Sequence, residues 1–490
     1  MSSLIVASFF GILTTLLLVY GLNSLVMVWL FIRRYERRHR EQLSFIKDYK
    51  VTSWPKVTTQ IPVYNEANVV ERVIDAVCAM EYPSGDHAVQ ILDDSTDGTS
   101  RLIDERVEQH RQSGVNIRVI RRSNRQGYKA GALHEAHEEI EGELLAIFDA
   151  DFVPPKDFLL KSVPFMVDGA DLGFIQARWE HLNRNQSWLT KAQALGIDGH
   201  FMVEQAGRCW NDLYLNFNGT AGLWRKKAIE DGGGWSWDTL TEDMDLSYRV
   251  QLAGWEAEYL PWLSVPAELP EDINAFKSQQ FRWAKGSIQT ALKILPKLWK
   301  KEGLNFRFVQ ASLHMTHYLI HPLMVAMAIS SYFLLNTWSH IPVWLTTTFL
   351  VGILISMVST NTLYWVSQWK LGTSRRQTFK TMPGLMLLGV GIAINNSRAV
   401  LQALRRKESE FVRTPKRGDQ ILTSYKVSIP FVVALEILLG MTCLWGIWDH
   451  QMEGSWFHPF LLLYALGFSL VGWTTLLHAN RNRQGPLGVT

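Results

Sequence analysis

The sequence predicts an α/β domain with a parallel-rich sheet, inserted between one N-terminal and about four C-terminal membrane-spanning helices. Apolar segments of spanning length lie at both ends, and the charged region between them alternates strand and helix patterns. The composition agrees, since 47% of the 490 residues are hydrophobic and 20 are Trp, more than a soluble chain usually carries. The net charge of +3 gives no argument for a nucleic-acid partner. The three cysteines are far apart and match no metal-binding or disulfide pattern: Cys78, Cys209 and Cys443.

The first apolar segment covers residues 4–32, which is long enough to cross a bilayer at about 20 residues per span. A basic stretch at 33–40 follows it. Positive residues favour the cytoplasmic side of a membrane. We therefore expect residues 1–32 to form a span with an external N-terminus, and residues 33–55 to form a basic cytoplasmic linker.

Residues 56–300 carry charge throughout and contain no apolar run of spanning length, which predicts a cytoplasmic domain with interfacial helices near its end. Strand and helix patterns alternate in its first half. Such alternation predicts βαβ units and a parallel sheet. We expect strands at 57–63, 87–92, 117–120 and 144–148, and helices at 69–80, 99–113 and 129–139.

Two acidic pairs follow predicted strands: Asp93 with Asp94, and Asp149 with Asp151. In parallel sheets, ligands bind beyond the carboxyl ends of the strands. Carboxylates at that edge suit Mg²⁺ or Mn²⁺, which are held by one or two carboxylates together with phosphate oxygens. For residues 93–98 a turn is an equally good interpretation, because Asp, Ser and Gly are turn residues.

A third acidic cluster follows Thr241 and precedes residues with helical spacing; it comprises Glu242, Asp243 and Asp245. Taken alone, it predicts a helix capped by the Thr241 side chain, with an acidic first turn. Together with the acidic pairs at the strand ends, it predicts an active site built from carboxylates.

Beyond residue 300 the chain becomes apolar again. Four segments are long enough to span, at about 310–336, 343–368, 428–448 and 457–479. A weakly apolar segment at 381–400 has basic flanks on both sides, so we expect it to lie in the interface or to re-enter the membrane. This gives five spans and a cytoplasmic tail at 481–490; six spans are the alternative.

Three histidines near the second span, His314, His317 and His321, have helical spacing. They are interpreted as polar residues at a protein-facing membrane boundary, with the lining of a path through the membrane or metal binding as alternatives.

An ordered series of motifs resembles the processive family 2 inverting glycosyltransferases of the cellulose synthase superfamily. It is most similar to the cellulose-synthase-like A mannan synthases and their bacterial relatives. The motifs are Ile61-Pro-Val-Tyr-Asn-Glu66, Leu92-Asp-Asp-Ser-Thr-Asp97, Asn124-Arg-Gln-Gly-Tyr-Lys-Ala-Gly-Ala-Leu133, Phe148-Asp-Ala-Asp-Phe152, Gln176-Ala-Arg-Trp179, Phe217-Asn-Gly-Thr-Ala-Gly222, Thr241-Glu-Asp243 and Gln279-Gln-Phe-Arg-Trp283.

The resemblance implies a nucleotide-diphospho-sugar transferase (GT-A) domain and a role for each matching position. Asp243 would be the general base, with Glu242 beside it, and Asp149 and Asp151 would bind the metal. Gly219, Thr220 and Trp283 would lie on the acceptor side. A loop at 411–418 resembles the gating loop of cellulose synthases, through Phe411, Thr414 and Lys416. The donor-binding residues would be Tyr64, Glu66, Asp94, Lys129, Asp149, Gln279, Arg282 and Trp283.

The expected function is polymerisation of hexose units from GDP-mannose or UDP-glucose in a plasma or Golgi-type membrane, with β-1,4 as the expected form of the β linkage. The partners are then a nucleotide sugar, a polysaccharide acceptor and the lipid bilayer, with passage of the polymer through the spans. Transfer of one sugar to a membrane lipid and a non-catalytic sugar-binding subunit are the alternatives. The oligomeric state stays open.

Overall fold

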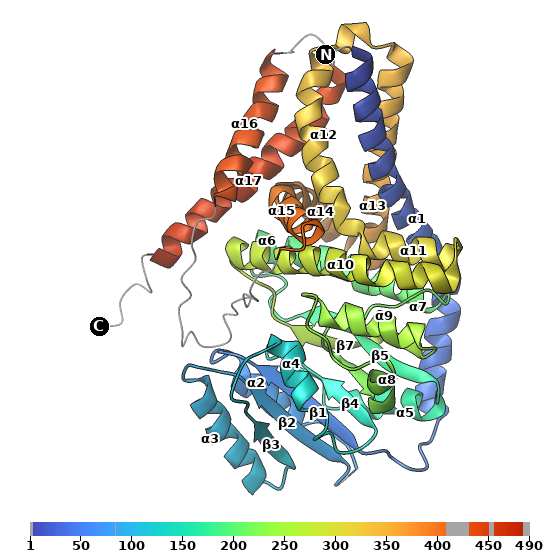
Figure 1. Cartoon of the computed structure of the whole chain (residues 1–490), viewed down its shortest axis with the longest axis vertical. Helices are drawn as coiled ribbons and strands as arrows, with labels where there is room; N and C mark the ends of the chain where they lie inside the picture. Colours follow the sequence, from blue (N-terminus) through green and yellow to red (C-terminus); the bar gives the residue numbers. More distant parts are fainter. Residues whose placement is uncertain (1–2, 84, 408–430, 450–454, 484–490) are drawn as a thin grey trace.

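The computed structural model describes residues 3–83, 85–407, 431–449 and 455–483. Its strands form one sheet at the bottom of Figure 1, and long helices rise above that sheet. The strands are β1 (Val57–Val63), β2 (His87–Asp93), β3 (Ile117–Ile120), β4 (Leu144–Ile147), β5 (Leu172–His181), β6 (Gly222–Arg225) and β7 (Glu256–Ala267).

The sheet has seven strands in the order β3-β2-β1-β4-β6-β5-β7. Only β6, among the described strands, runs antiparallel to its neighbours β4 and β5; the other pairs are parallel. The predicted parallel-rich sheet is thus confirmed, and β1 to β4 lie within one residue of the expected bounds. The sequence patterns did not reveal β5, β6 and β7.

Helices cover both faces of the sheet because the central strands are apolar on both sides, as buried parallel strands are. In β4, Leu144 and Ala146 pack into one core cluster, and Leu145 and Ile147 pack into another. The helices of this domain are α2 (Val70–Cys78), α3 (Thr99–Gln112), α4 (Tyr128–Glu135), α5 (Phe158–Asp168), α6 (Trp188–Gly199), the π-helix η1 (His200–Gln205), α7 (Ala206–Cys209), α8 (Lys226–Asp231), α9 (Glu242–Leu252) and α10 (Ile273–Glu302).

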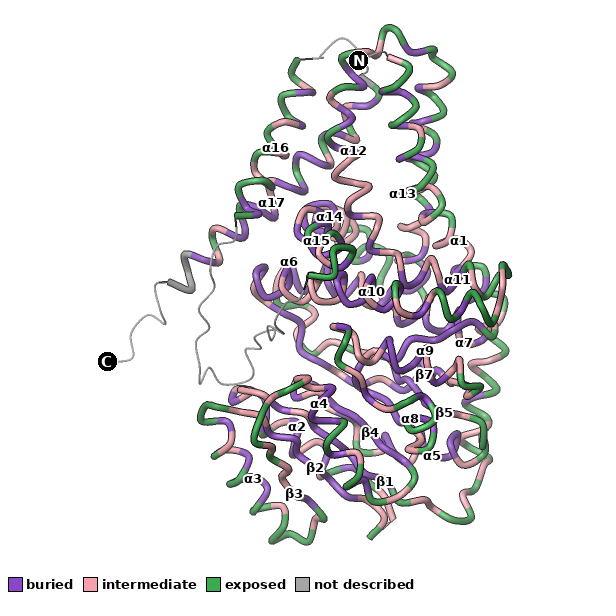
Figure 2. The backbone as a smooth tube through the Cα atoms, in the orientation of Figure 1, coloured by how far each residue is buried: buried purple, intermediate pink, exposed green. Residues whose placement is uncertain are grey.

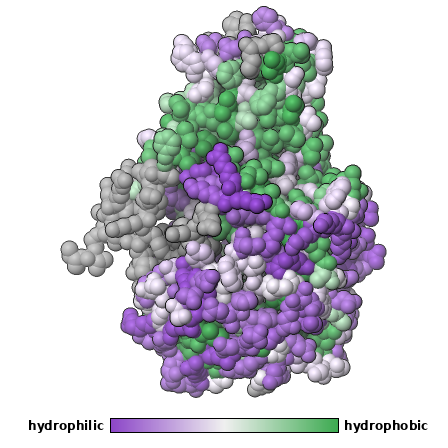
Figure 3. All heavy atoms as spheres, in the orientation of Figure 1, coloured by the Kyte–Doolittle hydropathy of each residue, from purple (hydrophilic) through white to green (hydrophobic). Residues whose placement is uncertain are grey.

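Five helical segments of the described chain are long and apolar enough to cross a membrane. Their upper parts form an apolar belt, whereas the sheet domain below is hydrophilic (Figure 3). They lie in α1 (Ser3–Asp48), α12 (Ile320–Leu335) with its preceding turn, α13 (Val343–Lys370), α16 (Val432–Asp449) and α17 (His458–Arg483). The weakly apolar segment forms α14 (Arg375–Gly391) and α15 (Ala393–Leu404), bent by 44° at their junction, and would make a sixth span if the pair crossed together.

Helix α1 continues without a break from the membrane segment to the sheet domain (Figure 1). Near its lower end, Arg38 forms an ion pair with Glu258 of β7 at 2.9 Å. The Gln42 amide donates to the Tyr259 carbonyl oxygen at 2.9 Å. Near its upper end, the Ser356 hydroxyl of α13 donates to the Leu17 carbonyl oxygen at 3.2 Å. One helix therefore joins both parts of the molecule.

Two helix predictions need correction. The expected helix 129–139 ends at Glu135, and the following residues form turns. The expected span 310–336 is broken: α11 (Phe306–Met315) ends before a 3₁₀ turn, and the spanning segment begins at His317. The three histidines consequently belong to three different elements rather than to one helix, with His314 in α11 and His321 in α12.

Candidate active site

A cavity of about 230 Å³ lies between the carboxyl edge of the sheet and α10. The strand directions explain its position. The carboxyl ends of β1, β2 and β4 lie side by side, and antiparallel β6 begins where β4 ends, with Gly222 paired to Ile147. The loop before β6 is therefore brought to the same edge. Figure 2 shows buried backbone running through the sheet and α10 on either side of this region.

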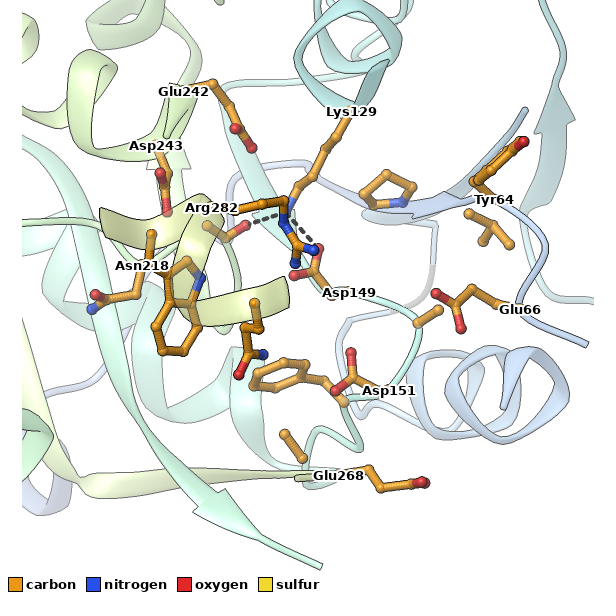
Figure 4. A pocket seen from close by; sticks show the side chains of 18 of the residues that line it. Tyr64, Glu66, Lys129, Asp149, Asp151, Asn218, Glu242, Asp243, Glu268 and Arg282 are labelled. Atoms are coloured by element: carbon orange, nitrogen blue, oxygen red, sulfur yellow. Dashed lines mark hydrogen bonds and ion pairs between the residues drawn. The ribbon is translucent and has the colours of Figure 1, made fainter. Parts of the chain in front are cut away.

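Asp149 lies in the middle of the cavity, beside the cationic side chains of Lys129 and Arg282 (Figure 4). The Lys129 ammonium donates to Asp149 Oδ1 at 2.5 Å and to the Gly219 carbonyl oxygen at 2.8 Å. Burial alone would lower the pKa of Lys129, but the carboxylates of Asp149 and Glu242 raise it. Lys129 is therefore a firmly charged ammonium that joins the end of β4 to the loop before β6.

At one end of the cavity lie Tyr64 and Glu66, which follow β1 (Figure 4). Asp94, which follows β2, also lines the cavity. Arg122 donates to both carboxylate oxygens of Asp94, at 2.8 and 2.6 Å. Asp93 lies outside the cavity lining, where Arg121 donates to it at 2.8 Å. Of the two adjacent carboxylates, Asp94 is the one that lines the cavity.

Glu242 and Asp243 lie at the other end, in the first turn of α9. The Thr241 side chain makes no capping hydrogen bond, contrary to the prediction; its hydroxyl instead lies 3.1 Å from that of Thr290 in α10. Gly286 permits this approach, since a Cβ there would lie 2.5 Å from Thr241 Cγ2. The start of α9 is thus fixed by packing against α10.

The pKa of Asp243 is raised to about 8, chiefly by burial and also by the neighbouring negative charge of Glu242. Burial also raises the pKa of Glu242. The charge of Lys129 acts in the opposite direction on both groups. A helix N-terminus ordinarily stabilises a carboxylate, so desolvation outweighs the helix dipole here. Asp243 is consequently a far stronger base, once ionised, than an exposed aspartate.

Helix α10 supplies Gln279, Arg282 and Trp283 to the cavity. Burial lowers the pKa of Arg282 to about 10, which leaves the guanidinium charged near neutral pH. The Trp283 ring lies 6.4 Å from that of Trp179, centroid to centroid. The cavity is therefore cationic in its middle and has an aromatic wall.

The residues present fit a divalent cation. Asp149 and Asp151 both line the cavity. Within the described parts of the chain, no group of three or more His, Cys, Asp and Glu side chains is arranged to hold a metal. Mg²⁺ and Mn²⁺ are commonly bound by one or two carboxylates plus phosphate oxygens, so two protein ligands are sufficient when a diphosphate is present.

The structure brings together nearly all the predicted site residues. Thr220 is the exception: it is buried behind the cavity, where its hydroxyl accepts from the Asp149 backbone N–H at 2.8 Å. Phe411, Thr414 and Lys416 lie outside the described residues. Those that line the cavity are Tyr64, Glu66, Asp94, Lys129, Asp149, Asp151, Gly219, Glu242, Asp243, Gln279, Arg282 and Trp283.

Sequence reasoning missed four polar residues of the cavity lining: Arg125, His181, Asn218 and Glu268. Arg125 and Asn218 lie within motifs that were recognised, so their positions could have been inferred from the neighbouring Lys129 and Gly219. His181 and Glu268 belong to the ends of β5 and β7. These two residues could be recognised as part of the site only if β5 and β7 had been predicted.

Residues 55–286 match the family described as "Glycosyltransferase like family 2". The "Probable glucomannan 4-beta-mannosyltransferase 1" of Arabidopsis thaliana is 33% identical over 86% of this chain and 77% of its own length. The "Probable glucomannan 4-beta-mannosyltransferase 15" of the same plant is 32% identical over 93% of this chain and 85% of its own length.

Among solved structures, a mannosyltransferase from Pyrobaculum calidifontis in complex with GDP-Man and Mn²⁺ has a TM-score of 0.50 and 18% sequence identity. The match covers 79% of this chain and 99% of that chain. At this identity the likeness concerns the fold, which is the GT-A-like mixed sheet with surrounding helices.

Proposed function

The chain belongs to glycosyltransferase family 2, in the group of the glucomannan 4-beta-mannosyltransferases, and we propose that it is a membrane-embedded synthase that polymerises β-1,4-linked mannosyl units from GDP-mannose. The names of the relatives support the sugar and the linkage. The observation that carries the proposal is the cavity itself, in which carboxylates at one end and cations in the middle face each other beneath the apolar helices.

The proposed reaction forms a bond between the acceptor 4-hydroxyl oxygen and C1 of the donor mannose, and breaks the bond between C1 and the diphosphate, with inversion at C1. Asp243 takes the hydroxyl proton, and its raised pKa supports that role. Glu242 contributes the negative charge that strengthens this base. GDP leaves with the electron pair of the broken bond.

Positive charge on the protein stabilises the departing diphosphate. Lys129 contributes a point charge, whereas Arg282 offers a planar fork of donors that suits phosphate oxygens. Asp149 and Asp151 would hold Mg²⁺ or Mn²⁺, which neutralises diphosphate charge when bound. Tyr64, Glu66 and Asp94 would hold the nucleoside, and Gly219 and Trp283 would face the acceptor.

The proposed orientation places the sheet domain in the cytoplasm. The basic stretch at 33–40 and the basic residues around 375–376 and 405–407 support this side, because cytoplasmic flanks are enriched in Lys and Arg. In the proposed arrangement the polymer would leave through the membrane helices. A plasma or Golgi-type membrane is the proposed location.

The test uses the purified full-length protein with Mn²⁺ and separately supplied GDP-mannose, UDP-glucose or UDP-N-acetylglucosamine. We expect a polymer from GDP-mannose only, measured as GDP release and as product size. A product of one sugar on a lipid would contradict polymerisation, and a polymer from UDP-glucose alone would contradict the donor. Asp243→Asn should remove transfer, while the exposed control Asp157→Asn should retain it; transfer by Asp243→Asn would exclude that residue as the base.

A further inference from the structure

Three arginines in the segment between β3 and α4 differ in what they contact. Arg121 pairs with Asp93 and Asp104, each at 2.8 Å. Arg122 pairs with Asp94 at 2.6 Å. Arg125, which lines the cavity, has neither an ion pair nor a side-chain hydrogen bond among the described residues, and its Nε is buried without a partner there.

The Arg125 guanidinium lies over an aromatic ring. Its Cζ atom lies 3.3 Å from the centroid of Tyr64 and 4.9 Å from that of Tyr128. A guanidinium carries all its N–H donors in its own plane, as a rigid fork. This leaves a charged, forked set of donors beside Tyr64 at the end of the cavity away from Asp243 (Figure 4).

The loop that carries Arg125 is fixed by its neighbours. Arg122 donates to the carbonyl oxygens of Gln126 and Tyr128, each at 2.7 Å. Gly127 and Tyr128 both have left-handed backbone, with φ of 71° and 51°, a conformation that a non-glycine residue adopts only at a cost. The surrounding contacts therefore hold the loop in a strained shape that presents Arg125 to the cavity.

We propose that Arg125 selects the nucleobase of the donor by donating to the O6 and N7 acceptors of guanine. This inference rests on the proposed use of a GDP-sugar, and it names the residue that distinguishes guanine from the other nucleobases. An arginine fork matches two adjacent acceptors, which guanine presents on its O6/N7 edge. Uracil has a single acceptor, O4, on the comparable edge, and adenine carries a donating amino group where guanine has O6.

Arg125 is placed in the cavity by its contact with the ring of Tyr64. In Figure 4, Lys129, Asp149 and Arg282 occupy the middle, whereas Tyr64 and Glu66 lie toward one side and Glu242 and Asp243 toward the other. A phosphate-binding role would place the unpaired arginine among the first group. Its position on the ring of Tyr64 favours contact with the base.

The experiment measures the affinity of the purified full-length protein for GDP, IDP, ADP and UDP with Mn²⁺. IDP keeps O6 and N7 but lacks the guanine amino group, so the wild type should bind GDP and IDP more tightly than ADP and UDP. Arg125→Gln should weaken GDP and IDP binding roughly 10- to 100-fold, the range of a bidentate base contact, with less than about a 3-fold change for ADP and UDP.

Two further variants complete the design. Arg125→Lys keeps the charge and can still donate to O6 and N7 of guanine, but it loses the planar fork, so it should retain a reduced preference for GDP over UDP. Arg101→Gln removes a charge whose side chain is 76% exposed, and should leave all four affinities unchanged. Equal weakening of all four nucleotides by Arg125→Gln would indicate a phosphate contact and overturn the inference.

The outcome also separates this inference from the proposed function. A wild-type protein that polymerises from GDP-mannose, with an unchanged GDP-to-UDP affinity ratio in Arg125→Gln, would overturn the role of Arg125 alone. A wild-type protein that binds UDP more tightly than GDP and polymerises UDP-glucose would overturn both.

Discussion

A β-carbon on Gly219 would lie 3.0 Å from Oδ2 of Asp243. The backbone at Gly219 has a φ of +81°, and its carbonyl oxygen accepts from Lys129. The residue thus meets two demands at once, because it adopts a left-handed conformation and leaves room for a carboxylate. The loop before β6 can approach the proposed base only with glycine at this position.

Gly219→Ala should lower kcat about 10- to 100-fold while GDP affinity stays nearly constant, because the added methyl displaces Asp243 rather than the nucleoside end. The control is Gly114→Ala, whose φ of +85° brings similar strain but whose Cβ would meet nothing within 4 Å. Steady-state transfer kinetics and GDP titration measure the two effects. Equal loss of activity in both variants would attribute the effect to strain alone.

The pH dependence of transfer should follow the ionisation of Asp243. Because a base acts in its ionised form, kcat/KM should rise with pH through the pKa of about 8 and level off above it. Glu242→Gln removes a negative charge that raises this pKa, so the midpoint should move to lower pH. A rate profile between about pH 6 and 10 measures both midpoints. An unchanged or higher midpoint in Glu242→Gln would show that the charge of Glu242 does not raise the pKa of the titrating group.

Arg282→Lys should reduce kcat roughly 10- to 100-fold even though the charge is retained, because an ammonium cannot offer two parallel donors to phosphate oxygens. Arg307→Lys is the matched control, since Arg307 is about half exposed and pairs with Glu302 outside the cavity lining. Single-turnover transfer from GDP-mannose gives the rate. Full activity in Arg282→Lys would show that a point charge is enough.

A buried ion pair joins α10 to a membrane helix, and its loss should destabilise the protein. Lys277 donates to the two Glu436 oxygens at 2.7 and 2.9 Å, and their side chains are 3% and 0% exposed. Glu436→Gln should cost about 3–5 kcal/mol because the ammonium loses its counter-charge. The double variant Lys277→Met/Glu436→Leu should recover most of this. Thermal unfolding in detergent measures the stability of each variant. An equal loss of stability in Glu436→Gln and in the double variant would contradict the explanation by an unpaired ammonium.

Local sequence patterns were sufficient to predict β1 to β4, because an apolar strand next to an amphipathic helix can be recognised from a few residues. They also located the carboxylates, since the carboxyl ends of parallel strands must share one edge. Strands β5 to β7 were not predicted. They do not follow the alternation of strand and helix seen in the first half of the domain, and β6 runs antiparallel to both of its neighbours. The register of their pairing depends on tertiary contacts, which no short pattern reports.

Other departures have equally specific causes. The Thr241 hydroxyl contacts Thr290 rather than the backbone of its own helix, a choice set by the approach of α10. The span expected from residue 310 starts later because Thr316 has a non-helical backbone at the end of α11. Arg125 could be recognised only with coordinates, since its importance lies in the absence of a partner among the described residues.

Helix α1 has 46 residues, which at 1.5 Å per residue makes it roughly 69 Å long. A single rod of this length, fastened to a strand of the sheet below and to a neighbouring helix above, fixes the distance between the cavity and the apolar segments. If the protein polymerises sugars as proposed, the cavity could not retreat as a product lengthens. Each added sugar would then push the growing chain by its own length, which would couple elongation to export.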